Sequence, residues 1–130
     1  LGNQQIGHLD EIISKRVSNF KNFYAAMKDN DDFVHYNLSH MSVISNFAMP
    51  IICKNQALSI KYKDRFTKAR IEIRPIIAGS ITKQPFYKKY TVDEDTNPNS
   101  ESIHDNGFYF GNNPEMTNDE IAKLCKLLEK

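Results

Sequence analysis

The residues of this sequence best suited to bind a polar ligand lie in one short stretch, residues 74–84. It begins with an arginine, whose rigid fork of donors suits a phosphate or a carboxylate. A glycine follows, which lets a backbone approach another group closely, and hydroxyl, amine and amide groups come after it. We predict a substrate-binding rim made of Arg74, Gly79, Ser80, Thr82, Lys83 and Gln84. The alternative is an exposed arginine at a strand end with a solvated turn after it.

Other candidate chemistry in the chain is weaker. The histidines, at positions 8, 35, 40 and 104, lack the spacing of metal ligands, and no glycine-rich nucleotide-binding pattern occurs. Cys53 and Cys125 stand far apart among apolar neighbours, which predicts two buried, inert thiols of a reducing compartment. We therefore expect neither a metal site nor a catalytic centre within this chain.

The elements that must position the rim form a small α+β pattern. Apolar residues recurring at steps of three and four predict helices over residues 3–28 and 56–69, and a capping box formed by Thr117 and Glu120 opens a last helix. Residues rich in β-branched and aromatic side chains predict strands at 43–53, 71–74 and 108–110. Between the last two strands, residues 91–104 are almost entirely polar and predict a flexible loop.

Length and charge narrow the class of protein. The chain has 130 residues and a net charge of +1, so we expect one domain, residues 1–130, with one core. Acidic residues are scattered among the basic ones, which does not favour a nucleic-acid partner. No apolar run is long enough to span a membrane, and a cytoplasmic protein is expected.

Four stretches of the chain together resemble a known family. They are GNQQIGHLDEIISKR at 2–16, SNFAMPII at 45–52, EIRPIIAGSITKQPF at 72–86 and FYFGNNPEMTNDEI at 108–121. The chain resembles the C-terminal small domain of the DegT-type sugar-nucleotide aminotransferase and dehydratase family, which are pyridoxal-phosphate enzymes of fold type I. The Arg-Pro, Ala-Gly and Gln-Pro pairs within 74–85 resemble its nucleotide-sugar 3-dehydratase branch, which serves lipopolysaccharide biosynthesis. Ser80 departs from the asparagine usual in that branch.

The resemblance implies a division of labour. In this family a large N-terminal domain holds pyridoxal phosphate, with a lysine in the aminotransferases or a histidine in the dehydratases at the cofactor, and neither that domain nor that residue lies in this chain. The chain begins at Leu1 rather than at methionine, and we expect it to be a C-terminal fragment of a larger two-domain enzyme, inactive alone. Its small, mainly antiparallel sheet covered by helices would wall the substrate cleft.

Further expectations follow from the same resemblance. We expect the parent enzyme to be a homodimer acting on a nucleotide sugar, with Asn112 and Asn113 joining the substrate-binding residues. One apolar face, including part of the helix at 6–27, should pack on the missing large domain. Two alternatives remain open: the parent is a nucleotide-sugar aminotransferase, or the chain is a stand-alone α+β module that binds a phosphorylated or polar ligand.

Overall fold

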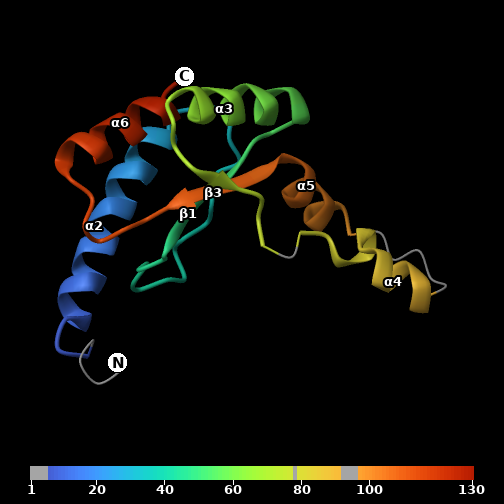
Figure 1. Ribbon diagram of the computed structural model, residues 1–130, viewed down its shortest axis with the longest axis horizontal. Helices are drawn as coiled ribbons and strands as arrows, with labels where there is room; N and C mark the ends of the chain where they lie inside the picture. The colour runs from blue at the N-terminus through green and yellow to red at the C-terminus, as the bar shows by residue number, and fades with distance from the viewer. Residues whose placement is uncertain (1–5, 78, 92–96) are drawn as a thin grey trace. The chain divides into compact units, whose positions relative to one another are not determined.

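The computed structural model describes residues 6–77, 79–91 and 97–130 (Figure 1). Three short strands form a small antiparallel sheet in the order β1-β3-β2. They are β1 (Ala48–Ile52), β2 (Ile73–Arg74) and β3 (Gly107–Gly111). The chain divides into two compact units, a first unit of Leu1–Met49 with Phe110–Lys130 and a second unit of Pro50–Tyr109. The predicted α+β class is confirmed, and a single domain over residues 1–130 stays a prediction.

The first unit is built on two packed helices, α2 (Leu9–Met27) and α6 (Asn118–Leu128). Helix α2 buries aromatic side chains, among them Phe23, whose ring meets that of Phe110 edge-on at 5.2 Å, a favoured aromatic arrangement. Beyond the end of α2, the Asn30 amide donates to the carbonyl of Leu128 at 2.7 Å. These contacts fix the two helices against each other.

Helix α6 begins as the sequence predicts. The hydroxyl of Thr117 accepts a hydrogen bond from the Glu120 amide at 3.3 Å, and the Glu120 carboxylate accepts one from the Thr117 amide at 2.8 Å. This reciprocal capping box satisfies two amides that a helix start otherwise leaves unpaired.

The second unit is organised around α3 (Gln56–Lys68). The side chain of Asn55 accepts a hydrogen bond from the Leu58 amide at 3.0 Å and caps the helix. One face of α3 buries Tyr62 and Phe66, and the Phe66 ring meets that of Phe108 edge-on at 5.5 Å. The helix packs against β2 and against a second helix, α5 (Pro98–Asn106).

Helix α5 corrects the prediction of a loop over residues 91–104. Residues 92–96 lie outside the described residues, but a helix begins at Pro98, where the fixed backbone angle of proline suits a first helical position. Its sequence, PNSESIHDN, holds a single apolar side chain, Ile103, so no apolar periodicity marks it. Its contact with α3 stabilises it instead.

Other boundaries moved for similar reasons. The first helix starts at Leu9 within the described residues, and the strand predicted over 43–53 is confirmed only for Ala48–Ile52. Between β2 and α5 the chain forms a short 3-10 helix, η1 (Ile81–Lys83), and a one-and-a-half-turn helix, α4 (Pro85–Tyr90). Both are too short for periodicity to reveal. None of the described helices is both long enough and apolar enough to span a membrane.

Candidate functional site

The predicted binding residues lie in both units. Arg74, Gly79 and the polar residues up to Gln84 belong to the second unit, and Asn112 and Asn113 belong to the first. Within the second unit, they follow the end of β2 and run through η1 to the start of α4.

Arg74 is exposed, and its donor fork is engaged by a carboxylate two residues before it, just ahead of β2. Its Nε donates to Oε1 of Glu72 at 2.9 Å, and its Nη2 lies 2.8 Å from the same oxygen. The hydrogen bond that Arg74 donates to Glu72 raises the pKa of the guanidinium above its ordinary value. A phosphate at this position would have to share the guanidinium with Glu72, which an exposed ion pair of small net stability permits.

Gly79 adopts a backbone conformation that only glycine takes without strain. Its φ is +51°, in the left-handed region. The space that a side chain would need is also filled, because an ideal Cβ built on Gly79 would lie 2.1 Å from Nδ1 of His104 on α5. The imidazole of His104 therefore occupies the space that the missing side chain of Gly79 leaves open.

The two hydroxyl residues of the segment differ in exposure. Ser80 is fully buried, and its Oγ lies 2.9 Å from Oγ1 of Thr82, which is half-buried. The Ser80 hydroxyl therefore faces the interior of the segment rather than its rim, contrary to the prediction. The reason is the turn at Gly79, which directs the next side chain inward as η1 begins.

Lys83 carries an accessible charge within a fixed ion pair. Its Nζ lies 2.9 Å from Oδ2 of Asp105 on α5. The hydrogen bond raises the pKa of Lys83 and lowers that of Asp105 from their ordinary values. An ammonium has three donors, so the pair with Asp105 leaves capacity for a ligand oxygen. Gln84 follows in extended conformation just before α4.

The two asparagines of the first unit have different roles. Asn112 is only 1% exposed. Its Nδ2 donates to the carbonyls of Arg16 and Asn46, both at 3.0 Å, and its Oδ1 accepts from Asn19 at 3.1 Å. A substrate contact by this side chain would require breaking those bonds. Asn113 is exposed, and its Oδ1 accepts a hydrogen bond from a backbone amide at 3.1 Å.

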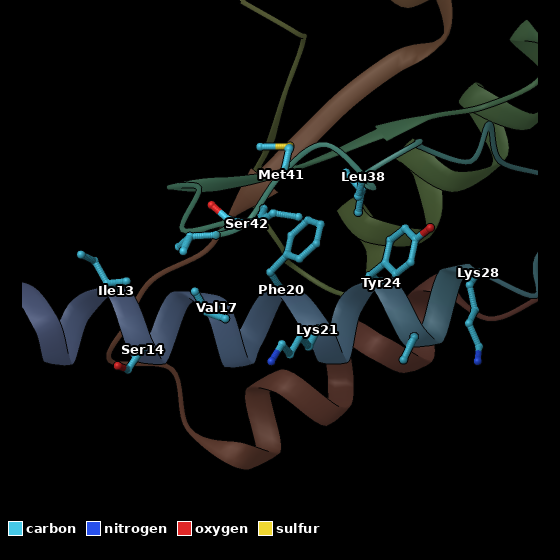
Figure 2. A pocket seen from close by; sticks show the side chains of 13 residues that line it. Ile13, Ser14, Val17, Phe20, Lys21, Tyr24, Lys28, Leu38, Met41 and Ser42 are labelled. Atoms are coloured by element: carbon cyan, nitrogen blue, oxygen red, sulfur yellow. The ribbon is translucent and has the colours of Figure 1, made fainter.

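A groove that the sequence did not reveal lies in the first unit, between α2 and residues 38–44 (Figure 2). Its volume is about 640 Å³, within the range of ligand-sized cavities. Ile13, Val17, Phe20 and Tyr24 form its floor and point toward Met41. Their spacing of four, three and four residues was a readable helical stripe, but the opposite wall has no periodic pattern.

The described residues do not fit pyridoxal phosphate. Holding the cofactor calls for a pocket that carries a cluster of donors for its phosphate, whereas mainly apolar side chains line the groove of the first unit. The same part of the chain holds no group of three histidine, cysteine or acidic side chains able to bind a metal ion. Cys53 is buried as predicted, and Cys125 is half-buried rather than buried.

Comparison with known proteins identifies relatives of this architecture. The sequence profile of the DegT/DnrJ/EryC1/StrS aminotransferase family matches residues 1–129. No curated protein matches the chain. Among solved structures, GDP-4-keto-6-deoxy-D-mannose-3-dehydratase of E. coli with bound hydrated pyridoxal phosphate superposes with a TM-score of 0.82 at 26% identity, over 98% of this chain and 33% of that one.

Two further structures extend the comparison. GDP-4-keto-6-deoxymannose-3-dehydratase with a trapped PLP-glutamate geminal diamine has a TM-score of 0.82 and 26% identity, over 98% of this chain and 34% of that chain. A DegT/DnrJ/EryC1/StrS aminotransferase of Brucella abortus has a TM-score of 0.74 and 17% identity, over 96% and 32%. The chain thus spans about a third of the length of the structures that it matches.

Proposed function

Because the chain belongs to the DegT/DnrJ/EryC1/StrS aminotransferase family, we propose that it is the C-terminal small domain of a pyridoxal-phosphate-dependent nucleotide-sugar 3-dehydratase. The complete enzyme would remove the C3 oxygen of a nucleotide-linked 4-keto-6-deoxyhexose. The observation that carries this choice is the higher similarity to the 3-dehydratase, 26% identity and a TM-score of 0.82, than to the aminotransferase, 17% and 0.74.

In this proposal the cofactor is held outside the chain. Two findings support it: the chain spans about a third of the length of the matched structures, and mainly apolar side chains line the groove of its first unit. The contribution of this chain would then be binding and orientation. Alone, it would be inactive.

We assign the substrate-facing role to the exposed groups of residues 74–84. A nucleotide sugar carries a diphosphate, and cationic side chains bind phosphate oxygens through charge-assisted hydrogen bonds. Arg74 and Lys83 present such groups, and Thr82 and Gln84 add neutral ones. Asn113, in the first unit, is exposed and is proposed separately as a substrate contact. Ser80 and Asn112 would act through the packing of their own unit, because both are buried.

The apolar side of the first unit supports a docking role. Met41 and Val43, which line the groove of Figure 2, are exposed, and so are Leu9 and Phe47 of the same unit. Such exposed apolar patches mark interaction sites in soluble proteins. We propose that the cofactor-binding domain covers this face, that the complete enzyme is a cytoplasmic homodimer, and that it serves lipopolysaccharide or O-antigen sugar synthesis. Free chain that neither self-associates nor binds an apolar dye would contradict the docking role.

Two other functions remain as alternatives. A nucleotide-sugar aminotransferase is favoured by the name of the matching family and by the second group of matched structures. A stand-alone module for a phosphorylated or polar ligand rests on the exposed cations of residues 74–84 alone.

A cofactor titration tests the division of labour. The purified chain is mixed with equimolar pyridoxal phosphate, and its absorbance spectrum and retention through gel filtration are measured. We expect no stoichiometric complex, because the chain spans about a third of the length of the matched structures and mainly apolar side chains line the groove of its first unit. A tight, one-to-one complex would refute the proposal that the cofactor is held elsewhere. The coding sequence adjoining the chain then separates the alternatives, since a dehydratase carries histidine and an aminotransferase carries lysine at the cofactor.

A further inference from the structure

The C-terminal end of α5 touches the segment 76–83 at three successive points, all within the second unit. An ideal Cβ on Gly107 would lie 2.7 Å from Cγ1 of Ile76, so the missing side chain makes room for that residue. The His104 ring covers Gly79, and Asp105 binds Lys83 at 2.9 Å. The three contacts lie at residues 76, 79 and 83 and therefore hold the segment over its length.

The end of α5 is itself held in place. Helix α5 packs on α3, the Asn106 carbonyl accepts a hydrogen bond from the Cys53 amide at 3.2 Å, and the chain continues at once into β3. A group fixed by a helix and a sheet can orient a loop, whereas an exposed ion pair alone stabilises little.

We propose that His104 and Asp105 are positioning residues, which fix the conformation of residues 79–84 and thereby direct the Lys83 ammonium toward the phosphates of a nucleotide-sugar ligand. The ligand class rests on the function proposed above. The positioning itself rests only on the contacts of α5. Asp105 restrains Lys83 at one of its three donors, and His104 keeps the turn at Gly79 closed.

The resonances of the segment test the positioning without any ligand. In ¹⁵N-labelled chain, Asp105→Asn should shift the backbone amides of residues 79–84, and Asp105→Glu should return most of them toward their original positions. The control is Asp64→Asn, which removes another lysine–aspartate ion pair, Lys68 Nζ to Asp64 Oδ2 at 2.6 Å, from α3 of the same unit. Unshifted segment amides in Asp105→Asn, as in Asp64→Asn, would overturn the proposal.

Affinity for pyrophosphate, the probe for the ligand's phosphates, tests the direction of Lys83. We expect Asp105→Asn to weaken binding about three- to fivefold, the range that an exposed charged contact supports, and Asp64→Asn to leave it unchanged. The double variant Lys83→Asp, Asp105→Lys keeps the ion pair with its charges exchanged. It should restore the resonance positions of the segment amides but not the affinity for pyrophosphate, because the ammonium then lies on α5. Tighter pyrophosphate binding in Asp105→Asn would overturn the proposal, since it would show that Asp105 competes with the ligand for the Lys83 ammonium. If the unaltered chain binds no pyrophosphate, the phosphate-binding role fails, while the amide shifts still decide the positioning.

Discussion

Replacing Gly79 by alanine tests the turn on which the candidate site depends. The left-handed conformation, at φ +51°, costs an alanine about 1–2 kcal/mol. The new Cβ would also meet His104, whose Nδ1 lies 2.1 Å away and whose Cγ lies 3.2 Å away. The ring must therefore swing out of its place, at a cost of about 1 kcal/mol. We expect Gly79→Ala to destabilise the chain by about 2–3 kcal/mol.

The two causes can be separated by a double-mutant cycle. His104 is exposed, so His104→Ala alone should cost less than about 0.5 kcal/mol. In that background Gly79→Ala loses its steric component and keeps its backbone strain, which predicts a coupling of about 1 kcal/mol between the two sites. Urea unfolding followed by circular dichroism measures these differences, because the chain has no tryptophan.

A matched control uses a second glycine. Gly111 has no atom within 4 Å of an ideal Cβ and no positive φ, so Gly111→Ala should change the stability by less than about 0.5 kcal/mol. The reasoning is refuted if Gly79→Ala is no more costly than Gly111→Ala. It is also refuted if removing the His104 ring leaves the cost of Gly79→Ala unchanged.

Further predictions concern the first unit. Asn112→Ala removes three buried or part-buried hydrogen bonds, and should lower the unfolding free energy by about 3 kcal/mol, whereas Asn113→Ala should cost less than about 1 kcal/mol in the same urea assay. Thr117→Ala should cost about 1 kcal/mol through loss of the cap. Hydrogen bonds from the backbone amide and the hydroxyl of Thr117 lower the pKa of Glu120, so its contribution is present above the ordinary glutamate pKa and is lost as pH falls through the lowered value; urea midpoints in Glu120→Gln should lack this acid dependence. Burial raises the pKa of the Cys125 thiol, so its alkylation near pH 8 should be slower than that of a free cysteine, measured by mass spectrometry with unfolded chain as the control.

The elements read best from the sequence are those whose signals are local. The apolar stripes of α2 and α3 and the capping box of α6 each depend on residues within one or two turns, and all three helices were predicted. Helix α5 carries no such stripe, because its stability comes from packing on α3. No local pattern reports a contact between elements that lie far apart in the sequence.

The candidate site was predicted in part for the same reason. The substrate-binding role of the polar residues stays a prediction, and the positive φ of Gly79 fits the choice of glycine. The sequence could not show that Ser80 turns inward or that Asn112 holds together three backbone stretches of the first unit. It also gave no sign that Lys83 has a partner on α5, because Asp105 follows it by 22 positions.

The most direct test of the central claim uses the protein encoded by the whole reading frame that contains this chain. That protein is incubated with pyridoxal phosphate, glutamate and GDP-4-keto-6-deoxymannose, the substrate in the names of the matched 3-dehydratase structures, and the sugar product is identified by mass spectrometry. The account predicts a product that has lost the C3 oxygen and gained no nitrogen. An amino sugar would contradict the dehydratase assignment, and a reading frame without a cofactor-binding domain would contradict the division of labour.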